Sequence, residues 1–300
     1  NYTYRKVMRK LYPEWDALCA DFIRVPSNGI YPTKFLQKHI GAELLRDEAE
    51  LKRTMVQILT SPLGRCLDTV QQLVDLGVTW LDLNIGCPSG TVVKHRGGSF
   101  WLKTPEELIT LVSAIRKIHP HFFSVKMRIG FETTDNFVDI LKGLEASGVD
   151  AVTVHARTRQ QMYSTPADWS YITQAVKSVS IPIIANGDIW SLADAKRMFD
   201  STGCHSVMIA RGALKSPWMV SFKNSDDAEN FDYTGEIKRY FFALMQAWKE
   251  ENLPESTIAK KIKELSRYIF DEMDEGAKIK RSILLAPNHL YQTEILRGLL

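Results

Sequence analysis

Short apolar runs recur along the chain, and each is followed by a stretch with helical periodicity. Seven such runs occupy residues 17–25, 54–60, 80–87, 122–130, 151–158, 181–189 and 206–214. One intervening helix is predicted to begin at Thr104-Pro105-Glu106-Glu107, which supplies an N-cap residue, a first-turn proline and an acidic first turn. Continuously apolar strands that alternate with helices indicate a parallel sheet covered on both faces.

Two α/β architectures fit this alternation. An open doubly wound sheet usually carries its strongest glycine motif after its first strand. Here polar residues and glycines follow nearly every apolar run, and in a barrel these positions share the rim where active sites are built. The pattern therefore favours a (β/α)8 TIM barrel. Because only seven strands are countable, we expect the first barrel strand to be missing before Asn1.

The pattern changes after residue 223. Residues 224–233 are polar and rich in turn formers, as is typical of a linker. Beyond them the strand pattern stops, and amphipathic helical periodicity covers 234–252, 256–272 and 275–286. We predict a barrel domain over 1–223, a linker over 224–233 and an all-helical domain over 234–300.

Composition narrows the class of protein only modestly. Hydrophobic residues make up 45% and charged residues 24%, and the net charge of +3 permits a nucleic-acid partner without requiring one. The four cysteines include no Cys-x-x-Cys pair, so neither a metal site nor a disulfide framework is indicated, and a reducing cytoplasm fits best. No apolar run approaches the ~18 to 20 residues of a membrane span. We expect a cytoplasmic monomer.

Side chains with useful chemistry follow the predicted strands at one rim. In chain order they are Gln57, Asn84, Cys87, Lys126, Arg128, His155, Arg157, the segment Asn186-Gly187-Asp188, and Ala210-Arg211-Gly212. Each alone has a structural explanation, since a strand-end histidine is more often a core group and Asn-Gly-Asp is most often a turn. Their convergence at one end of one barrel favours a common site.

The last two segments have a specific meaning in barrels. Loops after the last two strands commonly bind a phosphate through backbone N–H groups, and the guanidinium of Arg211 could bind the same phosphate through two N–H groups. Flavin mononucleotide (FMN) would fit beside such a site. Lys126 would stabilise the negative charge of the reduced ring, and Gln57 would hydrogen-bond the ring's polar edge.

Cys87 ends a predicted strand and is followed by Pro88. A cysteine is most often a packing residue, and a nucleophile would need a base such as His155, which nothing in the sequence selects. A proton donor needs less, because a thiol is mostly protonated near neutral pH. The rim position favours chemistry, and the following residues 89–98 are predicted to form a mobile, cationic loop.

Five ordered segments resemble the motifs of the tRNA-dihydrouridine synthases. They are LDLNIGCPS with KHRGGSFWL, VKMRIG, VHARTRQQMY, IIANGDIW and MIARGAL, and the match runs from about residue 17 to 222. ANGDIW and AKKIKEL resemble the bacterial C-type subfamily most. The resemblance implies FMN-dependent reduction of a uridine in the D-loop of tRNA, position 16 for the C-type, to 5,6-dihydrouridine, with NADPH as reductant. The helical tail resembles the family's RNA-binding domain.

The resemblance also implies residue roles. Cys87 matches the cysteine that protonates C5 of the uracil while hydride reaches C6, and Asn84 matches a residue that contacts this base. The matching flavin contacts are Gln57, Lys126, Asn186, Gly187, Asp188, Ala210 and Arg211, with His155 at the flavin–substrate junction. The target uridine must be flipped out to reach such a site.

Further cationic residues are candidates for contact with the RNA. Arg157 lies at the rim, and Lys94, His95 and Arg96 follow Cys87. In the tail, Lys260, Lys263 and Arg267 share one helical face, and a second cluster occupies 278–281. A solvated charged surface explains these tail residues equally well, but with a flavin barrel in the same chain we predict that they contact tRNA phosphates.

The chain departs from the family pattern in two places, and two other interpretations of the sequence remain open. The chain lacks the Ala-Pro-Met-x-Gly motif of the family's first strand, and the segment 57–61 keeps Gln57 but not the family's following glycine. One rival is a small-molecule FMN-barrel dehydrogenase of the dihydroorotate type, which would not need a cationic helical domain. The other is a non-catalytic RNA-binding barrel that has lost its flavin.

Overall fold

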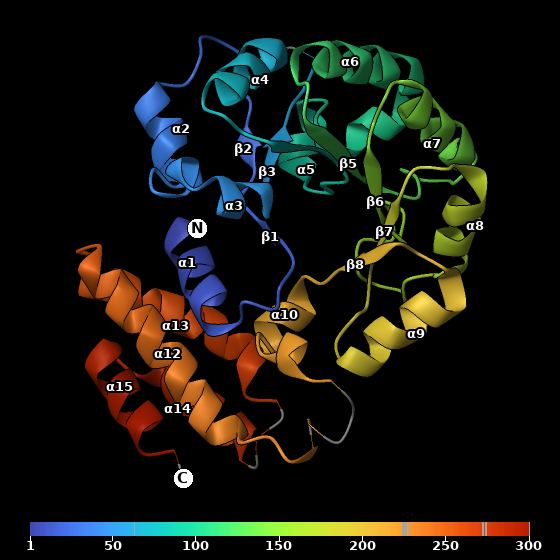
Figure 1. Ribbon diagram of the computed structural model, residues 1–300. Coiled ribbons are helices and arrows are strands. Elements are labelled where there is room, and N and C mark those ends of the chain that lie inside the picture. The colour runs from blue at the N-terminus through green and yellow to red at the C-terminus, as the bar shows by residue number, and fades with distance from the viewer. Residues whose placement is uncertain (63, 224–226, 228, 272, 274, 300) are drawn as a thin grey trace. The chain divides into compact units, whose positions relative to one another are not determined.

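The computed structural model describes residues 1–62, 64–223, 227, 229–271, 273 and 275–299. The chain divides into two compact units. The first unit comprises Asn1–Tyr2, Asp16–Asp188 and Ala195–Met208, and the second comprises Thr3–Trp15, Ile189–Asp194 and Ile209–Leu300. The first contains the strands, and the second contains the C-terminal helices (Figure 1).

A parallel sheet forms the centre of the first unit. β1 (Leu18–Cys19) and β2 (Ile23–Arg24) pair with opposite ends of β3 (Thr54–Leu59). The order then follows the sequence through β4 (Trp80–Ile85), β5 (Phe122–Arg128), β6 (Ala151–His155), β7 (Ile183–Asn186) and β8 (Ser206–Met208). Because β1 and β2 share one place, the sheet has the seven predicted positions of a TIM barrel. No pairing of β8 with β1 occurs in the described part of the chain.

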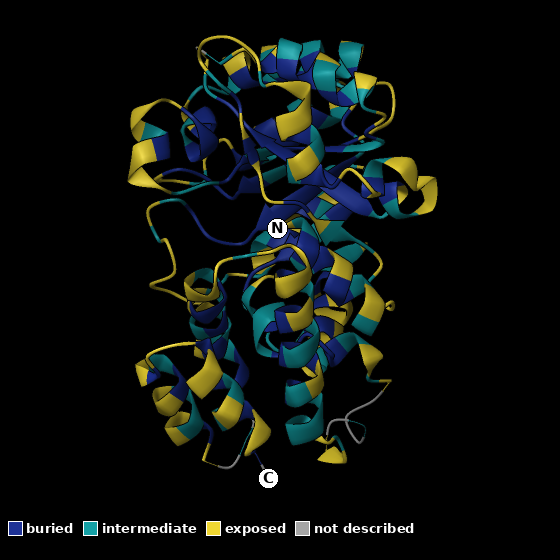
Figure 2. Cartoon of the chain, turned by 90° about the vertical axis from the view of Figure 1, so that its left-hand side faces the viewer, coloured by how far each residue is buried: buried dark blue, intermediate teal, exposed yellow. Residues whose placement is uncertain are grey.

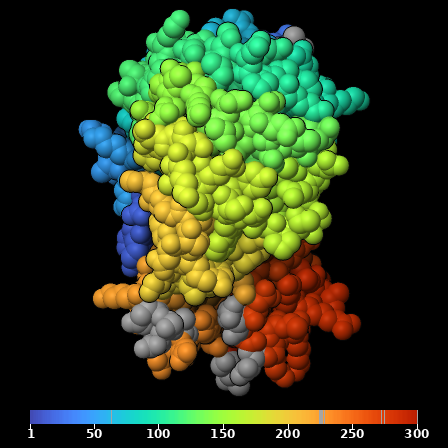
Figure 3. All heavy atoms as spheres, turned by 90° about the vertical axis from the view of Figure 1, so that its right-hand side faces the viewer, coloured from blue at the N-terminus to red at the C-terminus, as the bar shows by residue number. Residues whose placement is uncertain are grey.

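Helices connect the strands and surround the sheet (Figure 1). They are α2 (Thr33–Ile40), α3 (Glu48–Lys52), α4 (Cys66–Asp75), α5 (Gly90–Lys94), α6 (Pro105–Ile118), α7 (Phe137–Ala146), α8 (Ser170–Ser178) and α9 (Leu192–Thr202), with short 3-10 turns η1 (Leu44–Arg46) and η2 (Gly98–Lys103). α6 begins at Pro105 as predicted, although the hydroxyl of its N-cap residue Thr104 makes no capping hydrogen bond. The outer faces of α7 and α8 form a continuous surface in Figure 3.

The central strands have two chemically different faces. Side chains alternate across a strand, so residues two apart share a face. One face carries only apolar, fully buried side chains, namely Leu81, Leu83, Ile85, Phe123, Val125, Met127, Val152 and Val154. The other carries Asp82, Asn84, Ser124, Lys126, Arg128, Thr153 and His155. The expectation of strands that are apolar throughout is therefore wrong for this second face. Figure 2 shows the buried strands in dark blue beneath helices with exposed outer faces.

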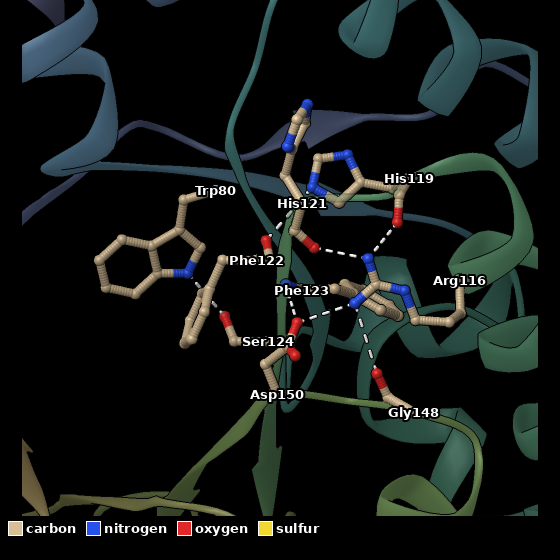
Figure 4. A network of polar contacts seen from close by, with 9 residues as sticks. All are labelled: Trp80, Arg116, His119, His121, Phe122, Phe123, Ser124, Gly148 and Asp150. Atoms are coloured by element: carbon tan, nitrogen blue, oxygen red, sulfur yellow. Dashed lines mark hydrogen bonds and ion pairs between the residues drawn. The ribbon is translucent and has the colours of Figure 1, made fainter.

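Arg116 organises the turn between α6 and β5 (Figure 4). Its guanidinium lies 2.8 Å from a carboxylate oxygen of Asp150 and donates to the backbone carbonyls of His119 and His121. The His119 ring is fully buried, with Nε2 3.2 Å from the carbonyl oxygen of Phe122. Burial lowers the pKa of His119 from 6.5 to about 4. The folded protein therefore keeps this imidazole neutral under mildly acidic conditions.

The free energy of unfolding is expected to fall as the pH is lowered from 7 to 5. The unfolded chain takes up a proton at His119 in this window and the folded chain does not, so this group alone removes about 2 kcal/mol. Urea titrations of His119→Gln should show a correspondingly weaker pH dependence. Identical slopes for wild type and His119→Gln would contradict the buried neutral state.

The second unit is helical and includes residues far from the C-terminus. Its main helices are α1 (Tyr2–Leu11), α10 (Arg211–Lys215), η3 (Met219–Ser221), α12 (Tyr233–Glu250), α13 (Glu255–Ile269), α14 (Gly276–Leu285) and α15 (His289–Arg297). The hydroxyl of Tyr12 donates to Glu236 at 2.6 Å, and those of Tyr4 and Tyr240 lie 3.2 Å apart. Phe241 and Phe270 stack in its core. α1 therefore belongs with α12, although the sequence placed it in the barrel domain.

The predicted boundaries at 223/224 and 233/234 stay predictions. The helical unit takes up residues 209–223 as well as 3–15, both of which the sequence assigned to the barrel. Four residues of the predicted linker, 224–226 and 228, lie outside the described residues. Within the part of the chain that is described, no helix combines the length and apolar character that crossing a bilayer requires.

Candidate active site

A chain of hydrogen bonds links β3, β4 and the loop after β4 on the polar face of the sheet. The backbone N–H of Gly86 donates to Oδ1 of Asn84 at 3.0 Å. Nδ2 of Asn84 donates to Oε1 of Gln57 at 2.8 Å, and Nε2 of Gln57 donates to Oδ2 of Asp82 at 2.8 Å. Because a backbone N–H can only donate, it fixes the orientation of both amides and makes Asp82 the terminal acceptor.

A second chain reaches Asp82 from the other side. Nε1 of Trp80 donates to the hydroxyl of Ser124 at 2.9 Å, and this hydroxyl donates to Oδ1 of Asp82 at 2.6 Å (Figure 4 shows the Trp80–Ser124 contact). The indole is also a pure donor, so the direction of this chain is fixed as well. Both carboxylate oxygens of Asp82 therefore accept hydrogen bonds, which favours the ionised form.

Asp82 and Lys126 are two opposite charges at the polar face. Burial raises the pKa of Asp82 to about 6, against the lowering effect of its hydrogen bonds and of Lys126. Burial likewise lowers the pKa of Lys126 to about 8, and Asp82 opposes that shift. Nζ of Lys126 donates to Oδ1 of Asn186 at 3.2 Å, and Nδ2 of Asn186 donates to the carbonyl oxygen of Met208 at 2.8 Å. Lys126 and Asn186 are thus brought together, as predicted for two rim residues.

The loop that carries Cys87 is fixed at three points. Asn84 holds the backbone N–H of Gly86, and Nε of Arg128 donates to the carbonyl oxygen of Gly86 at 3.0 Å. The backbone N–H of Ser99 donates to the carbonyl oxygen of Cys87 at 3.1 Å. Gly98 packs so closely that an added Cβ would lie 2.8 Å from Cβ of Cys87, and its φ of +57° favours glycine. Cys87 itself is a free thiol of intermediate exposure.

Residues 89–98 differ from the predicted irregular loop. They form α5 and lead into η2, and Val92, Gly97 and Gly98 are buried. Lys94 and His95 are exposed, as an RNA contact would require. Arg96 lies 3.2 Å from a carboxylate oxygen of Glu107 and over the ring of Phe100, so its charge is already paired. The prediction of a mobile loop missed the close packing of Gly98 on Cys87.

The predicted residues of β6 and β7 form a second cluster. The guanidinium of Arg157, only 3% exposed, pairs with Asp188, donates to the carbonyl oxygen of Thr165 and lies 3.3 Å from Nε2 of His155. A Cβ on Gly187, whose φ is +128°, would lie 3.2 Å from the His155 ring. Arg157 thus positions Asp188 and His155. Its predicted direct contact with RNA stays a prediction.

The remaining predicted residues lie in the second unit. Ala210 is the N-cap residue of α10, and the guanidinium of Arg211 lies 4.6 Å from the centre of the Trp190 ring. On α13, Lys260 and Arg267 are exposed and Lys263 is half-buried, while Ile258, Ile262 and Ile269 are buried in the unit's core. The three cations are thus turned away from that core, as the predicted helical face required.

Sequence reasoning missed Asp82, Ser124 and Thr153, and gave Arg128 no role. The available signal was the alternation of polar residues with period two, Asp82 and Asn84 in β4 and Ser124, Lys126 and Arg128 in β5. Thr153 pairs in register with Lys126, and its buried hydroxyl has no hydrogen-bond partner among the described residues. A buried, unpaired hydroxyl on this face indicates that the face receives a polar ligand or water.

The fold and this site define a TIM-barrel protein with a fixed thiol, a half-buried lysine and an ordered pair of amides on one face of its sheet. The family model described as dihydrouridine synthase (Dus) matches residues 32–286. The chain belongs to the dihydrouridine synthase family.

Curated relatives agree with this assignment. A tRNA-dihydrouridine(16) synthase of Pseudomonas syringae pv. tomato is 36% identical over 209 residues, which cover 67% of this chain and 64% of that protein. Another of that name, from Neisseria meningitidis serogroup B, is 31% identical over 81% of this chain and 73% of that protein. A probable tRNA-dihydrouridine synthase of Rickettsia bellii is 32% identical over 74% of each chain. The match thus spans slightly less than two thirds of the Pseudomonas protein.

Proposed function

We propose that this protein reduces a uridine of tRNA to 5,6-dihydrouridine, with FMN as cofactor and NADPH as reductant. The observation that carries the proposal is Cys87, held by Asn84, Arg128 and Ser99 in the electrostatic neighbourhood of Lys126. Family membership and relatives that are named for uridine 16 support the D-loop of tRNA, position 16, as the substrate. We further propose that the enzyme acts as a cytoplasmic monomer.

The residues of the polar face fit the ring of FMN. Lys126 is a half-buried cation beside Asn186, and the hydroxyl of Thr153, which pairs in register with Lys126, has no partner among the described residues. Gln57 keeps one N–H and one lone pair beyond its bonds to Asp82 and Asn84. We propose that these side chains, with His155, Gly187 and Asp188, hold the ring. Contact of Ala210 and Arg211 with the phosphate stays a prediction from the sequence. When bound, FMN supplies the hydride for C6 of the uracil.

The chain's own residues supply orientation and the proton. Asn84 retains one N–H and one lone pair, which suit the polar edge of a uracil. The thiol of Cys87 gives its proton to C5 as hydride reaches C6, and the resulting thiolate lies in the field of Lys126. The fixed loop keeps Sγ in place for this transfer, because proton donation requires hydrogen-bond reach of the reacting atom.

One experiment tests the function directly. Purified protein should carry a yellow cofactor, a property of the flavin itself, and with NADPH should form dihydrouridine in tRNA from a strain that lacks the modification. A flavin-bound protein that oxidises NADPH with dihydroorotate-type substrates and leaves tRNA unmodified would favour the small-molecule dehydrogenase. A colourless protein that binds no added FMN but binds tRNA would favour the non-catalytic rival.

We propose that the helical unit binds the phosphate backbone of the RNA. Lys260, Lys263 and Arg267 have no acidic partner among the described residues. Changing all three to Ala is expected to weaken tRNA binding and to lower the slope of log Kd against log salt by roughly two to three, because each phosphate contact contributes close to one. Filter binding at several salt concentrations measures this, and an unchanged slope would place the phosphate contacts elsewhere.

A further inference from the structure

Tyr31, just before α2, stacks in line with two rings of α2, those of Phe35 and His39. The centroids of Tyr31 and Phe35 lie 4.5 Å apart at 18°, and those of Phe35 and His39 lie 6.0 Å apart at 26°. Phe35 and His39 are four residues apart, which places them one above the other on a face of α2. Leu36 and Ile40, on a different face of α2, are fully buried. The three rings, called the ring ladder below, therefore lie outside the core of the unit.

The ring ladder is held at both ends by hydrogen bonds. The hydroxyl of Tyr31 donates to the carbonyl oxygen of Arg24 at 2.7 Å, and Nε2 of Gln72 donates to the carbonyl oxygen of Tyr31 at 2.8 Å. Nε2 of His39 lies 2.7 Å from the carbonyl oxygen of Asp21. These bonds set α2 alongside residues 21–24. Aromatic side chains fixed in this way lose little conformational freedom when a planar ligand stacks on them.

The surface around the ring ladder is apolar and cationic at once. Phe35 is 45% exposed, and Phe22 and Ile30, from the neighbouring segments, are 44% and 55% exposed. Arg24, Lys34 and Lys38 are exposed and have no acidic partner in the described part of the chain. Residues 22–40 contain no Asp or Glu, and the carboxylate of Asp21, at the His39 end, pairs with the amino group of Asn1 at 3.0 Å. The side that carries α2 faces the viewer in Figure 2. Flat rings among unpaired cations suit bases joined by phosphates.

The segment that carries the ring ladder follows β2 in sequence and begins at the C-terminal edge of the sheet. Arg24 pairs with Leu59, the last residue of β3, so the chain leaves β2 at the C-terminal edge of the strands. Asn84 and Cys87 lie at the same edge, at and beyond the end of β4. An RNA whose uridine reaches Cys87 therefore has neighbouring nucleotides at the edge from which the ring-ladder segment emerges.

We infer that unpaired bases of the RNA pack against the exposed edges of the ring ladder, with Phe35 at its centre and Lys34 and Lys38 on the backbone phosphates. Flipping the target uridine unstacks its neighbours, and these are the bases that gain most from an aromatic surface. The identity of the RNA as substrate tRNA rests on the proposed function, whereas the base contact itself does not. A second protein chain is the competing occupant of such an apolar face.

Binding of fluorescently labelled tRNA, measured without turnover, tests the inference. Phe35→Ala should weaken binding about tenfold with an unchanged salt slope, because a base packed against a ring contributes affinity without releasing counterions. Phe35→Trp should bind at least as tightly as wild type. Lys34→Ala combined with Lys38→Ala should instead lower the salt slope by up to about two. Phe199→Ala is the matched control, since Phe199 on α9 is 40% exposed and has no ring partner among the described residues.

Wild-type affinity in Phe35→Ala, or a Phe35→Trp variant as weak as Phe35→Ala, would overturn the inference. Sedimentation distinguishes the competing occupant: if Phe35→Ala dissociates an oligomer and leaves the RNA affinity unchanged, the ring ladder is a contact between copies and the inference is wrong. The proposed function is assayed separately as dihydrouridine formation. A wild-type protein that forms none, yet loses RNA affinity in Phe35→Ala, would refute the function and retain the inference.

Discussion

Cys87→Ala enzyme is expected to oxidise NADPH at the wild-type rate and to form dihydrouridine at least about 100-fold more slowly. The change removes the proposed proton donor to C5, and a positioned acid typically contributes ~10²- to 10⁴-fold to a rate. The loop should survive the substitution, because Asn84, Arg128 and Ser99 hold it through backbone groups that alanine retains. FMN binding should also persist, because the substitution changes no predicted flavin contact.

Two other thiols provide comparison variants for this test. Cys19 on β1 is exposed, and like Cys87 it is one of the groups that influence the pKa of Lys126. Cys19→Ala therefore asks whether a second thiol near Lys126 can serve as the acid. Cys204, buried near the start of β8, supplies the control for loss of a thiol as such. Product formation at the wild-type rate in Cys87→Ala, together with its loss in Cys19→Ala, would move the acid from β4 to β1.

Much of the fold could be predicted because its signals are local. Each apolar run became one strand position, and α6 began at Pro105, because strand and helix periodicities act over a few residues. β1 and β2 illustrate the limit. The single run 17–25 forms two short strands, since Leu18 pairs with Thr54 but Ile23 pairs with Ile58. Such a register change depends on β3, which is distant in sequence.

The site was predictable as a set of residues and less so as a network. Rim position identified Gln57, Asn84 and Lys126, but the acceptor that orders them, Asp82, was passed over inside an apparently apolar run. The packing of α1 against α12 could likewise not be predicted, because the tyrosine contacts that join them connect residues more than two hundred positions apart in the sequence. Long-range polar contacts carry little local signal.

Asp82 is expected to act as a positioning residue, and Asp82→Ala should slow dihydrouridine formation by roughly 10- to 100-fold. Alanine leaves Nε2 of Gln57 buried without its acceptor, which costs ~1–3 kcal/mol unless the amide reorients. A reoriented Gln57 presents its N–H groups to Nδ2 of Asn84, a second donor, so Asn84 must also turn and release the backbone N–H of Gly86 next to Cys87. The loss should appear in kcat, with bound FMN retained.

Asp82→Asn separates this orienting role from the charge of Asp82. Asparagine keeps one oxygen that can accept from Gln57, and the hydroxyl of Ser124 can accept from its amide nitrogen, so most of the rate should return. Both variants lose the negative charge that opposes the lowering of the pKa of Lys126. Any basic limb of the pH–rate profile that reports loss of the Lys126 proton should therefore move to lower pH in both. If Asp82→Asn were as slow as Asp82→Ala, the charge rather than the oriented amides would govern the reaction, and the hydrogen-bond chain from Asp82 to Gly86 would be a structural feature only.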